Sequence, residues 1–264
     1  MTNTESRTHS ITVLGEYLWA RRSIIQPEAV GLQREANRRV PGLRREEVAK
    51  LASISPDYYL RLEQGHDREP SDQVLRGIAR ALLLDKSAEQ HLLRLRRLQP
   101  HQLSNAGYSQ DEFTPGDGLL SLLKGWADTP ALIISSNFDV LLVNEVGVTV
   151  GDGRLQSGLN LVEAAFSAQA REEEGWMARA ERSLAALRYH GNPYDRRFQQ
   201  VVGRLSIRDD DFRRLWALHN ARPIPHGQVQ IDVSSSEKSV ATFNAFDVPG
   251  SDGLMVIVLT ESNL

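Results

Sequence analysis

The stretch "SISPDYYLRLEQGHDREPS" runs from Ser53 to Ser71 and directly follows the pattern "LRREEVAKLA" of residues 43–52. Ser55 is suited to cap a helix, because its hydroxyl can accept hydrogen bonds from backbone N–H groups that have no partner at a helix start. Pro56 fits the first helical position, where its missing N–H costs nothing. Gly65 is suited to end the helix. The stretch therefore predicts a short, capped helix of about two and a half turns.

This predicted helix has two different faces. Tyr59 and Leu62 form an apolar face, which we expect in the core, whereas Tyr58 and Arg61 lie on the opposite face. In the preceding segment, residues 48, 51 and 52 form another helical stripe. A turn of about three residues separates the two helices, which is the spacing of a helix-turn-helix.

Further amphipathic segments surround this pair. "ITVLGEYLWARRSII" comes before it, "EPSDQVLRGIARALLL" follows with Ser71 as its cap, and "SAEQHLLRLRRL" predicts another helix from Ser87. The front part of the chain is therefore expected to be all-α. A small helical bundle whose polar faces are only solvated is the alternative to a DNA-binding unit.

Charge is distributed unevenly along the chain, although the net charge is only −3. Residues 1–104 carry 17 Lys and Arg against 13 Asp and Glu, whereas residues 105–264 carry 14 against 21. A basic front half favours a polyanionic partner such as DNA. Arg34, Arg38 and Arg39 lie in a long predicted loop from Ser23 to Gly42, where they form either a second DNA contact, like an arm, or part of a solvated insertion.

The motifs "VPGLRREEVA", "DYYLRLEQG" and "PSDQVL" resemble the helix-turn-helix of the XRE (lambda-repressor-like) class, and more narrowly the MmyB-like regulators. The resemblance covers residues 11–98 and implies that one face of the recognition helix reads base edges in the major groove. It also implies that Glu63 pairs with Arg21 or Arg22. The implied base-facing residues are Pro56, Asp57, Tyr58 and Arg61, and the implied phosphate contacts are Arg44, Arg45, His66 and Arg68. Asp57 can instead serve only to complement the helix dipole, and Arg61 can instead be solvated.

The rear half has a different pattern. "ALIISSNFDVLLVN" predicts a hairpin with Asn137 and Asp139 near its turn, helical segments follow, and "GQVQIDVS", "SVATFNAFDV" and "GLMVIVLT" predict three more strands. This order favours an α+β fold with a five-stranded antiparallel sheet and helices packed on one face.

The rear half also resembles the ligand-binding half of MmyB-like regulators, which has a PAS-like fold, through "PALIISSNFDVLLVN" and "LSIRDDDFRRLWALHNAR". The family implies a small amphiphilic ligand, a fatty acid being one candidate. The chain departs from the family at Val143, where a Trp usually precedes Asn144. Helical spacing places a run of side chains on one face, which can hold an acyl chain and its carboxylate. The predicted pocket residues are Asn144, Phe212, Trp216, His219 and Arg222; alternatively, His219 is a core residue and Arg222 is at the surface.

Enzyme signatures are missing from the sequence. "VGDGRLQSG" has neither the P-loop nor the Rossmann spacing, no G-x-S-x-G elbow occurs, and the seven His form no tight ligand pair. The acidic runs "REEE" (171–174) and "DDD" (209–211) are interpreted as solvated helix starts. We therefore predict no enzyme activity, no metal and no cofactor.

These observations predict three regions: residues 1–98 as the helix-turn-helix DNA-binding domain, residues 99–118 as a linker, and residues 119–264 as the ligand-binding domain. The predicted function is a cytoplasmic transcription regulator that binds a double-stranded DNA operator and whose small ligand modulates that binding. We expect a homodimer, because operators of this class mirror a two-fold protein. No apolar run is long enough for a membrane span. The alternative is a DNA-binding protein whose rear domain binds a protein partner.

Overall fold

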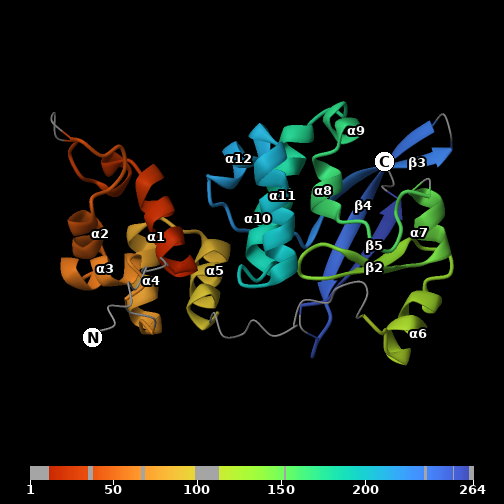
Figure 1. Cartoon of the computed structure of the whole chain (residues 1–264), viewed down its shortest axis with the longest axis horizontal. Coiled ribbons are helices and arrows are strands. Elements are labelled where there is room, and N and C mark those ends of the chain that lie inside the picture. The colour runs from red at the N-terminus through yellow and green to blue at the C-terminus, as the bar shows by residue number, and fades with distance from the viewer. Residues whose placement is uncertain are drawn as a thin grey trace, which may run out of the picture. The chain divides into compact units, whose positions relative to one another are not determined.

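A computed structural model describes residues 12–34, 38–66, 69–98, 113–151, 153–234, 237–251 and 253–261. These residues divide into two compact units, of which the first contains the helices before residue 99 and the second contains the sheet (Figure 1). The division follows the expected change from an all-α pattern to an α+β pattern. Each unit has its own apolar core.

The first unit consists of short helices around one core. It contains α1 (Val13–Ile24), the 3₁₀ helix η1 (Pro27–Val30), α2 (Arg45–Leu51), α3 (Pro56–Glu63), α4 (Asp72–Ala81) and α5 (Lys86–Arg97). The caps agree with the sequence, since the hydroxyls of Ser55 and Ser71 accept from the backbone N–H groups of Tyr58 and Val74. The last helix starts one residue before the expected Ser87, because Asp85 caps it.

The core of the first unit is formed by the apolar faces of these helices. Leu18, Val48, Tyr59, Leu62 and Ile78 are all fully buried in it, which confirms the two core positions expected in α3. Gly65 follows α3 in the left-handed region (φ 74°), where glycine is favoured over other residues. The helix-turn-helix expected from the sequence is therefore α2 and α3.

The segment between α1 and α2 is fastened to the helices by an inward-facing arginine. The side chain of Arg38 is only 1% exposed, and its guanidinium donates to the Glu47 carboxylate at 2.5 and 2.7 Å and to the carbonyl oxygen of Gly42. The hydrogen bonds from Arg38 lower the pKa of the Glu47 carboxyl, outweighing a smaller effect of burial. Arg38 therefore stabilises the start of α2.

The second unit is built on a five-stranded antiparallel sheet with the order β2-β1-β5-β4-β3. The strands are β1 (Ala131–Ile134), β2 (Val140–Val143), β3 (His226–Ser234), β4 (Glu237–Asp247) and β5 (Met255–Glu261). The apolar run "GLMVIVLT" supplies β5, which pairs with β1 on one side and with β4 on the other, and residues 254–259 are buried as expected. The fold class predicted from the sequence is confirmed.

Helices cover both faces of this sheet, not one (Figure 1). They are α6 (Asp117–Gly125), α7 (Glu145–Val150), α8 (Leu161–Ala165), α9 (Ala168–Arg171), α10 (Trp176–His190), α11 (Arg196–Arg208) and α12 (Asp210–Trp216). Leu123 of α6 packs against Ile133 and Val256. Leu132 and Ile257, their neighbours in the strands, point to the other face. The expectation of helices on one face was wrong because the short helix α6 was not predicted.

Candidate DNA interface and ligand cavity

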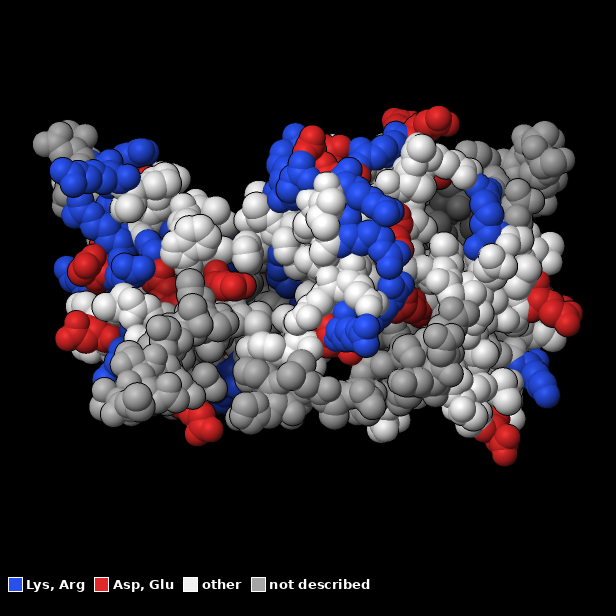
Figure 2. Space-filling model, viewed as in Figure 1, with Lys and Arg blue, Asp and Glu red and all other residues white. Residues whose placement is uncertain are grey.

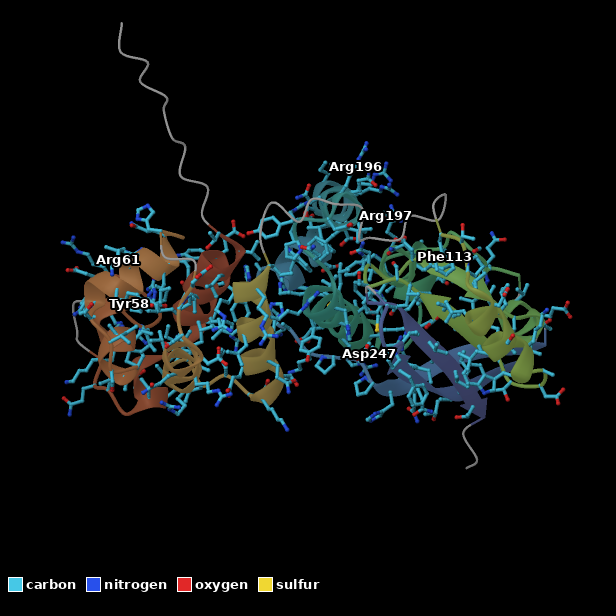
Figure 3. All side chains as sticks on the ribbon, turned by 90° about the horizontal axis from the view of Figure 1, so that it is seen from below. Tyr58, Arg61, Phe113, Arg196, Arg197 and Asp247 are labelled. Carbon is cyan, nitrogen blue, oxygen red and sulfur yellow. The ribbon has the colours of Figure 1, made fainter. Side chains whose placement is uncertain are left out.

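The outer face of α3 carries the side chains that the sequence assigned to base readout. Pro56, Asp57 and Arg61 are exposed, and Tyr58 is half-buried against the core. The guanidinium carbon of Arg61 lies 5.6 Å from the centre of the Tyr58 ring, so the two side chains form one surface on the outer side of the helix (Figure 3). An aromatic ring and a guanidinium on an exposed helix are groups that can reach base edges and phosphates in a major groove.

A buried ion pair fixes α3 from the inner side. The Glu63 carboxylate accepts from the guanidinium of Arg22 at 2.8 Å and from that of Arg45 at 3.1 Å. Arg22 also donates to the backbone carbonyl of Leu43 at 2.7 Å. The Glu63 side chain is 3% exposed, so this network joins α1, α2 and α3 in the interior. Of the two partners expected for Glu63, the structure selects Arg22 and adds Arg45.

The residues expected to contact phosphate are at the surface where they are described. Arg44 is half-buried, and Arg45 and His66 are exposed, although the Arg45 guanidinium already donates to Glu63. Arg68 lies outside the described residues. These phosphate roles stay predictions.

The arginines in the segment expected to form an arm differ in their exposure to solvent. Arg34 and Arg39 are exposed, and Figure 2 shows basic side chains gathered over the segment that joins η1 to α2. Arg38 does not fit this role, because its guanidinium is buried against Glu47. A DNA contact by an arm would therefore rest on the two exposed arginines.

A cavity of about 290 Å³ lies between the sheet and the helices α8, α9 and α10. Its volume is near the lower end of the range for small-molecule sites, about 300–1,000 Å³. The residues that line it are spread along the sequence, from residue 132 to residue 259, so only the tertiary structure brings them together. The lining residues are Leu132, Phe138, Leu155, Leu161, Ala165, Ala170, Glu173, Trp176, Arg179, Arg182, Ser183, Ile224, Gln228, Val229, Phe243, Ile257 and Leu259.

The cavity has an apolar buried wall and a polar exposed rim. Leu132, Phe138 and Leu259 are almost completely buried, whereas Arg182 and Gln228 are exposed. The neighbouring Arg179 donates to the Glu173 carboxylate at 2.7 Å and is therefore neutralised. Among the described residues, Arg182 has no anionic side chain paired with it. This arrangement suits a ligand with an apolar body and an anionic end.

Arg171 of α9 contacts Trp176, one of the residues that line the cavity. The guanidinium carbon of Arg171 lies 4.2 Å from the centre of the Trp176 ring. Arg171 also donates to the carboxylates of Asp209 and Asp211, which raises the pKa of its guanidinium. The acidic run 209–211 is therefore not merely solvated, as the sequence had suggested, because two of its three carboxylates hold Arg171.

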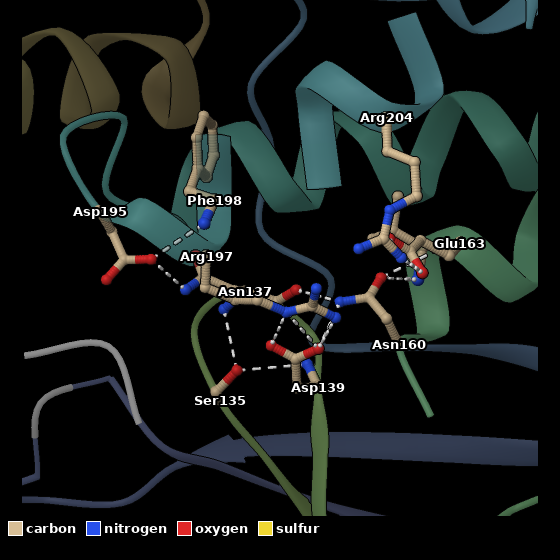
Figure 4. Close-up of polar contacts among 10 residues, drawn as sticks. Ser135, Asn137, Asp139, Asn160, Glu163, Asp195, Arg197, Phe198 and Arg204 are labelled. Carbon is tan, nitrogen blue, oxygen red and sulfur yellow. Dashed lines mark hydrogen bonds and ion pairs between the residues drawn. The ribbon is translucent and has the colours of Figure 1, made fainter. Parts of the chain in front are cut away.

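The turn between β1 and β2 is held by a network of buried polar groups (Figure 4). The Asp139 carboxylate accepts from Arg197 of α11 at 2.6 and 3.0 Å and from the Asn160 amide at 2.9 Å. The Asn137 amide donates to Asp195 at 2.9 Å. Asn137 and Asp139 are thus near the turn as expected, but they bind neighbouring segments of the protein and are buried.

The five predicted pocket residues do not line this cavity. Asn144 caps α7, and its side chain bonds to the backbone at Ala131, Trp126 and Thr129. Phe212 is fully buried with its ring edge-on to Phe166, which in turn packs on Trp176. Their role in binding a ligand stays untested.

The helical face expected from Phe212 to Arg222 is shorter than the sequence suggested. Helix α12 ends at Trp216, and His219 has a positive φ of 51°. Arg222 is exposed, and it precedes Pro223, a position where helical backbone is disfavoured. His219 and Arg222 therefore do not continue one helical face with Phe212.

The helical spacing of α10 could have indicated one part of the cavity wall from the sequence. Trp176, Arg179 and Ser183 stand at i, i+3 and i+7 of one helix, and all three line the cavity. Helical spacing alone favoured the segment of α12 instead, whose predicted pocket residues do not line the cavity.

The described residues include no group of His, Cys, Asp or Glu that could hold a metal ion. In the same part of the chain, no helix has both the length and the apolarity needed to cross a membrane.

Comparison with known proteins agrees with both units. A helix-turn-helix domain family matches residues 28–93, which include α2, α3 and α4. The family of the MmyB-like transcription regulator ligand binding domain matches residues 116–263, more than half of the chain. No curated protein matches the chain. Together, the helix-turn-helix and the ligand-binding unit are those of a DNA-binding transcription regulator, and the chain belongs to the MmyB-like regulator family.

Proposed function

We propose that this regulator binds a DNA operator as a homodimer in the cytoplasm, and that a small anionic amphiphile in the cavity modulates its DNA affinity. The observation that carries this proposal is the cavity itself, with its buried apolar wall and its exposed arginine at the rim. A partner protein that binds the second unit is the alternative. A cavity lined by buried apolar groups favours a ligand, because a protein partner would need an exposed surface.

The DNA part of the proposal rests on the outer face of α3. Arg61 is exposed there and can donate two hydrogen bonds to the O6 and N7 atoms of guanine, a frequent specific contact in the major groove. Its neighbour Tyr58 is fixed against the core and limits the directions that the guanidinium can take. These two residues, and Asp57 and Pro56 beside them, are proposed to face the bases.

Replacing Arg61 by Ala should weaken operator binding by about 1–3 kcal/mol and relax the preference at one base position. The operator is first obtained by selecting random duplexes with the full-length protein. Affinity is then measured for the operator and for its single-base variants. Arg208→Ala, which removes an exposed charge from the second unit, is the control and should leave the preference unchanged. An unaltered base preference in Arg61→Ala would exclude Arg61 from readout.

The ligand is proposed to be a carboxylate with an alkyl chain, a fatty acid being one candidate. Its chain would lie on Leu132, Phe138 and Leu259, and its carboxylate would accept hydrogen bonds from the guanidinium of Arg182. Mass spectrometry of an extract from the purified protein tests this directly. A stoichiometric amphiphile supports the proposal, whereas a protein that carries none and binds no carboxylate favours the partner alternative.

Replacing Arg182 by Ala should lower the affinity for decanoate about five- to tenfold, because the lost ion pair is partly screened by water. Calorimetric titration of the full-length protein measures this. The matched control is decanol, which has the same chain and no charge, and its affinity should not change in the variant. An equal loss for the acid and the alcohol would mean that Arg182 shapes the cavity and does not bind the headgroup.

Regulation would require the ligand to bind one arrangement of the dimer better than another. Such coupling free energies are typically about 1–3 kcal/mol. The coupling free energy is measured as the change in operator affinity when a carboxylate is added at a saturating concentration. Sedimentation of the free protein and of its complex with the operator gives the number of chains.

A further inference from the structure

Phe138 has a backbone conformation that is unfavourable for its side chain. It lies in the turn between β1 and β2 with φ 66°, in the left-handed region that glycine and asparagine adopt more readily. In this region the Cβ atom of a side chain comes too close to the following carbonyl oxygen. Such a residue persists where the surroundings hold it in place, and it is a pointer to function.

The surroundings of Phe138 hold its backbone on both sides. Its N–H donates to the Ser135 carbonyl at 2.9 Å, and its carbonyl accepts from the Leu161 N–H at 2.8 Å. The two flanking residues, Asn137 and Asp139, are the buried anchors of the polar network in Figure 4. The Ser135 hydroxyl oxygen accepts from the backbone N–H groups of both flanking residues at 3.2 Å.

The held side chain is part of the cavity wall. The Phe138 ring lines the cavity and is only 4% exposed, and its edge meets the His190 ring at a centroid distance of 6.2 Å. Leu132 and Leu259 beside it belong to the sheet, so their positions are set by strand pairing. Phe138 is the lining residue that a separate, polar support holds in an unfavourable conformation.

The cavity limits the size of a ligand. At about 290 Å³ it lies near the lower end of the range for small-molecule sites, about 300–1,000 Å³. A cavity of this volume suits a short alkyl carboxylate such as octanoate or decanoate better than palmitate, which is larger. Phe138 is part of the wall of this space, so a smaller side chain at this position would enlarge the cavity.

We propose that Phe138 is a specificity-determining residue that restricts the cavity to short alkyl carboxylates, and that the Asn137 and Asp139 network is the device that holds it. This inference rests on the proposed function, because it assumes that the cavity binds an amphiphile. It adds to that function a limit on the length of the ligand's alkyl chain and names the residue that sets this limit.

The test is a titration of the full-length protein with hexanoate, octanoate, decanoate, dodecanoate and palmitate. Each methylene that enters the cavity should raise the affinity about fourfold. In the unchanged protein we expect this rise to stop at octanoate or decanoate. In Phe138→Ala the rise should continue to dodecanoate or beyond, so that the ratio of the dodecanoate affinity to the octanoate affinity increases by about sixteenfold or more over the unchanged protein.

Two further variants make the result specific. Phe198→Ala removes a buried ring from α11 that does not line the cavity, and it should leave the length preference unchanged. Phe138→Gly also relieves the unfavourable φ, so it provides a folded variant if Phe138→Ala is unstable. Thermal unfolding measured in parallel shows whether the second unit, which contains these positions, remains folded in each variant.

The outcomes separate the inference from the function on which it rests. A length preference that is the same in all variants, or an optimum at palmitate in the unchanged protein, would overturn the role of Phe138 and leave the amphiphile proposal standing. An equal shift in Phe198→Ala would also overturn it. Failure of every carboxylate to bind the unchanged protein would overturn the amphiphile proposal itself.

Discussion

Replacing Glu63 by Ala should destabilise the first unit by about 3–5 kcal/mol, the cost of breaking a buried ion pair by removing one partner. The Glu63 side chain is 3% exposed and Arg22 is buried beside it. Without the carboxylate, the charge of Arg22 stays in the interior with one acceptor among the described residues, the carbonyl oxygen of Leu43. Natural domains are stable by only about 5–15 kcal/mol, so this variant should lose a large part of its folded population on warming.

Urea unfolding of the full-length protein, followed by circular dichroism, measures the loss. Glu46→Ala is the matched control, because it removes an exposed carboxylate from the adjacent helix α2. It should change the free energy of unfolding by less than about 0.5 kcal/mol. The double variant Arg22→Met/Glu63→Leu, which removes both charges, should recover most of the stability. Equal effects of Glu63→Ala and Glu46→Ala would show that the buried pair does not stabilise the unit.

Replacing Asp139 by Ala should destabilise the second unit by about 2–4 kcal/mol, somewhat less than for a fully buried pair. The Asp139 side chain is 7% exposed, but that of Arg197 is 23% exposed and can be partly solvated after the loss. The hydrogen bonds that Arg197 donates to the Asp139 carboxylate outweigh burial and raise the pKa of the guanidinium. The Asn160 amide would also lose one of its two acceptors, leaving the carbonyl of Asn137.

The variant should also lose the shape of the cavity before the unit unfolds, since the turn that carries Phe138 is held by this network. Decanoate affinity and thermal unfolding of the same protein samples separate the two effects. Asp247→Ala removes an exposed carboxylate of β4 and serves as the control. The network would have no part in stability if both variants unfolded at the same temperature.

The local chemistry of α3 could be predicted in detail because it depends on neighbours in the chain. Ser55, Pro56 and Gly65 act on backbone groups within a few residues, so the start and the end of the helix follow from their order. The buried side of α3 follows from the helical period, as Tyr59 and Leu62 show. The strands of the sheet could also be predicted, because runs of apolar residues mark them locally in the sequence.

Side chains that choose between distant partners could not be predicted in this way. Arg38 lies in the same polar segment as Arg34 and Arg39, yet its guanidinium turns inward to Glu47. Asp209 and Asp211 were expected in solvent and instead hold Arg171. In each case the partner lies on another element, so the outcome depends on how the elements pack.

The sequence by itself determined the helix-turn-helix, the faces of α3 and the α+β pattern of the rear half, because local backbone chemistry and hydrophobic period decide these features. The family was indicated by the resemblance of several motifs and not by these physical patterns. Only the tertiary structure decided where the cavity lies and which residues line it. Phe138, Arg182 and Ile257 come from a turn, a helix and a strand that meet only in the folded unit. A cavity is the space that remains after packing, and no local pattern in a chain records it.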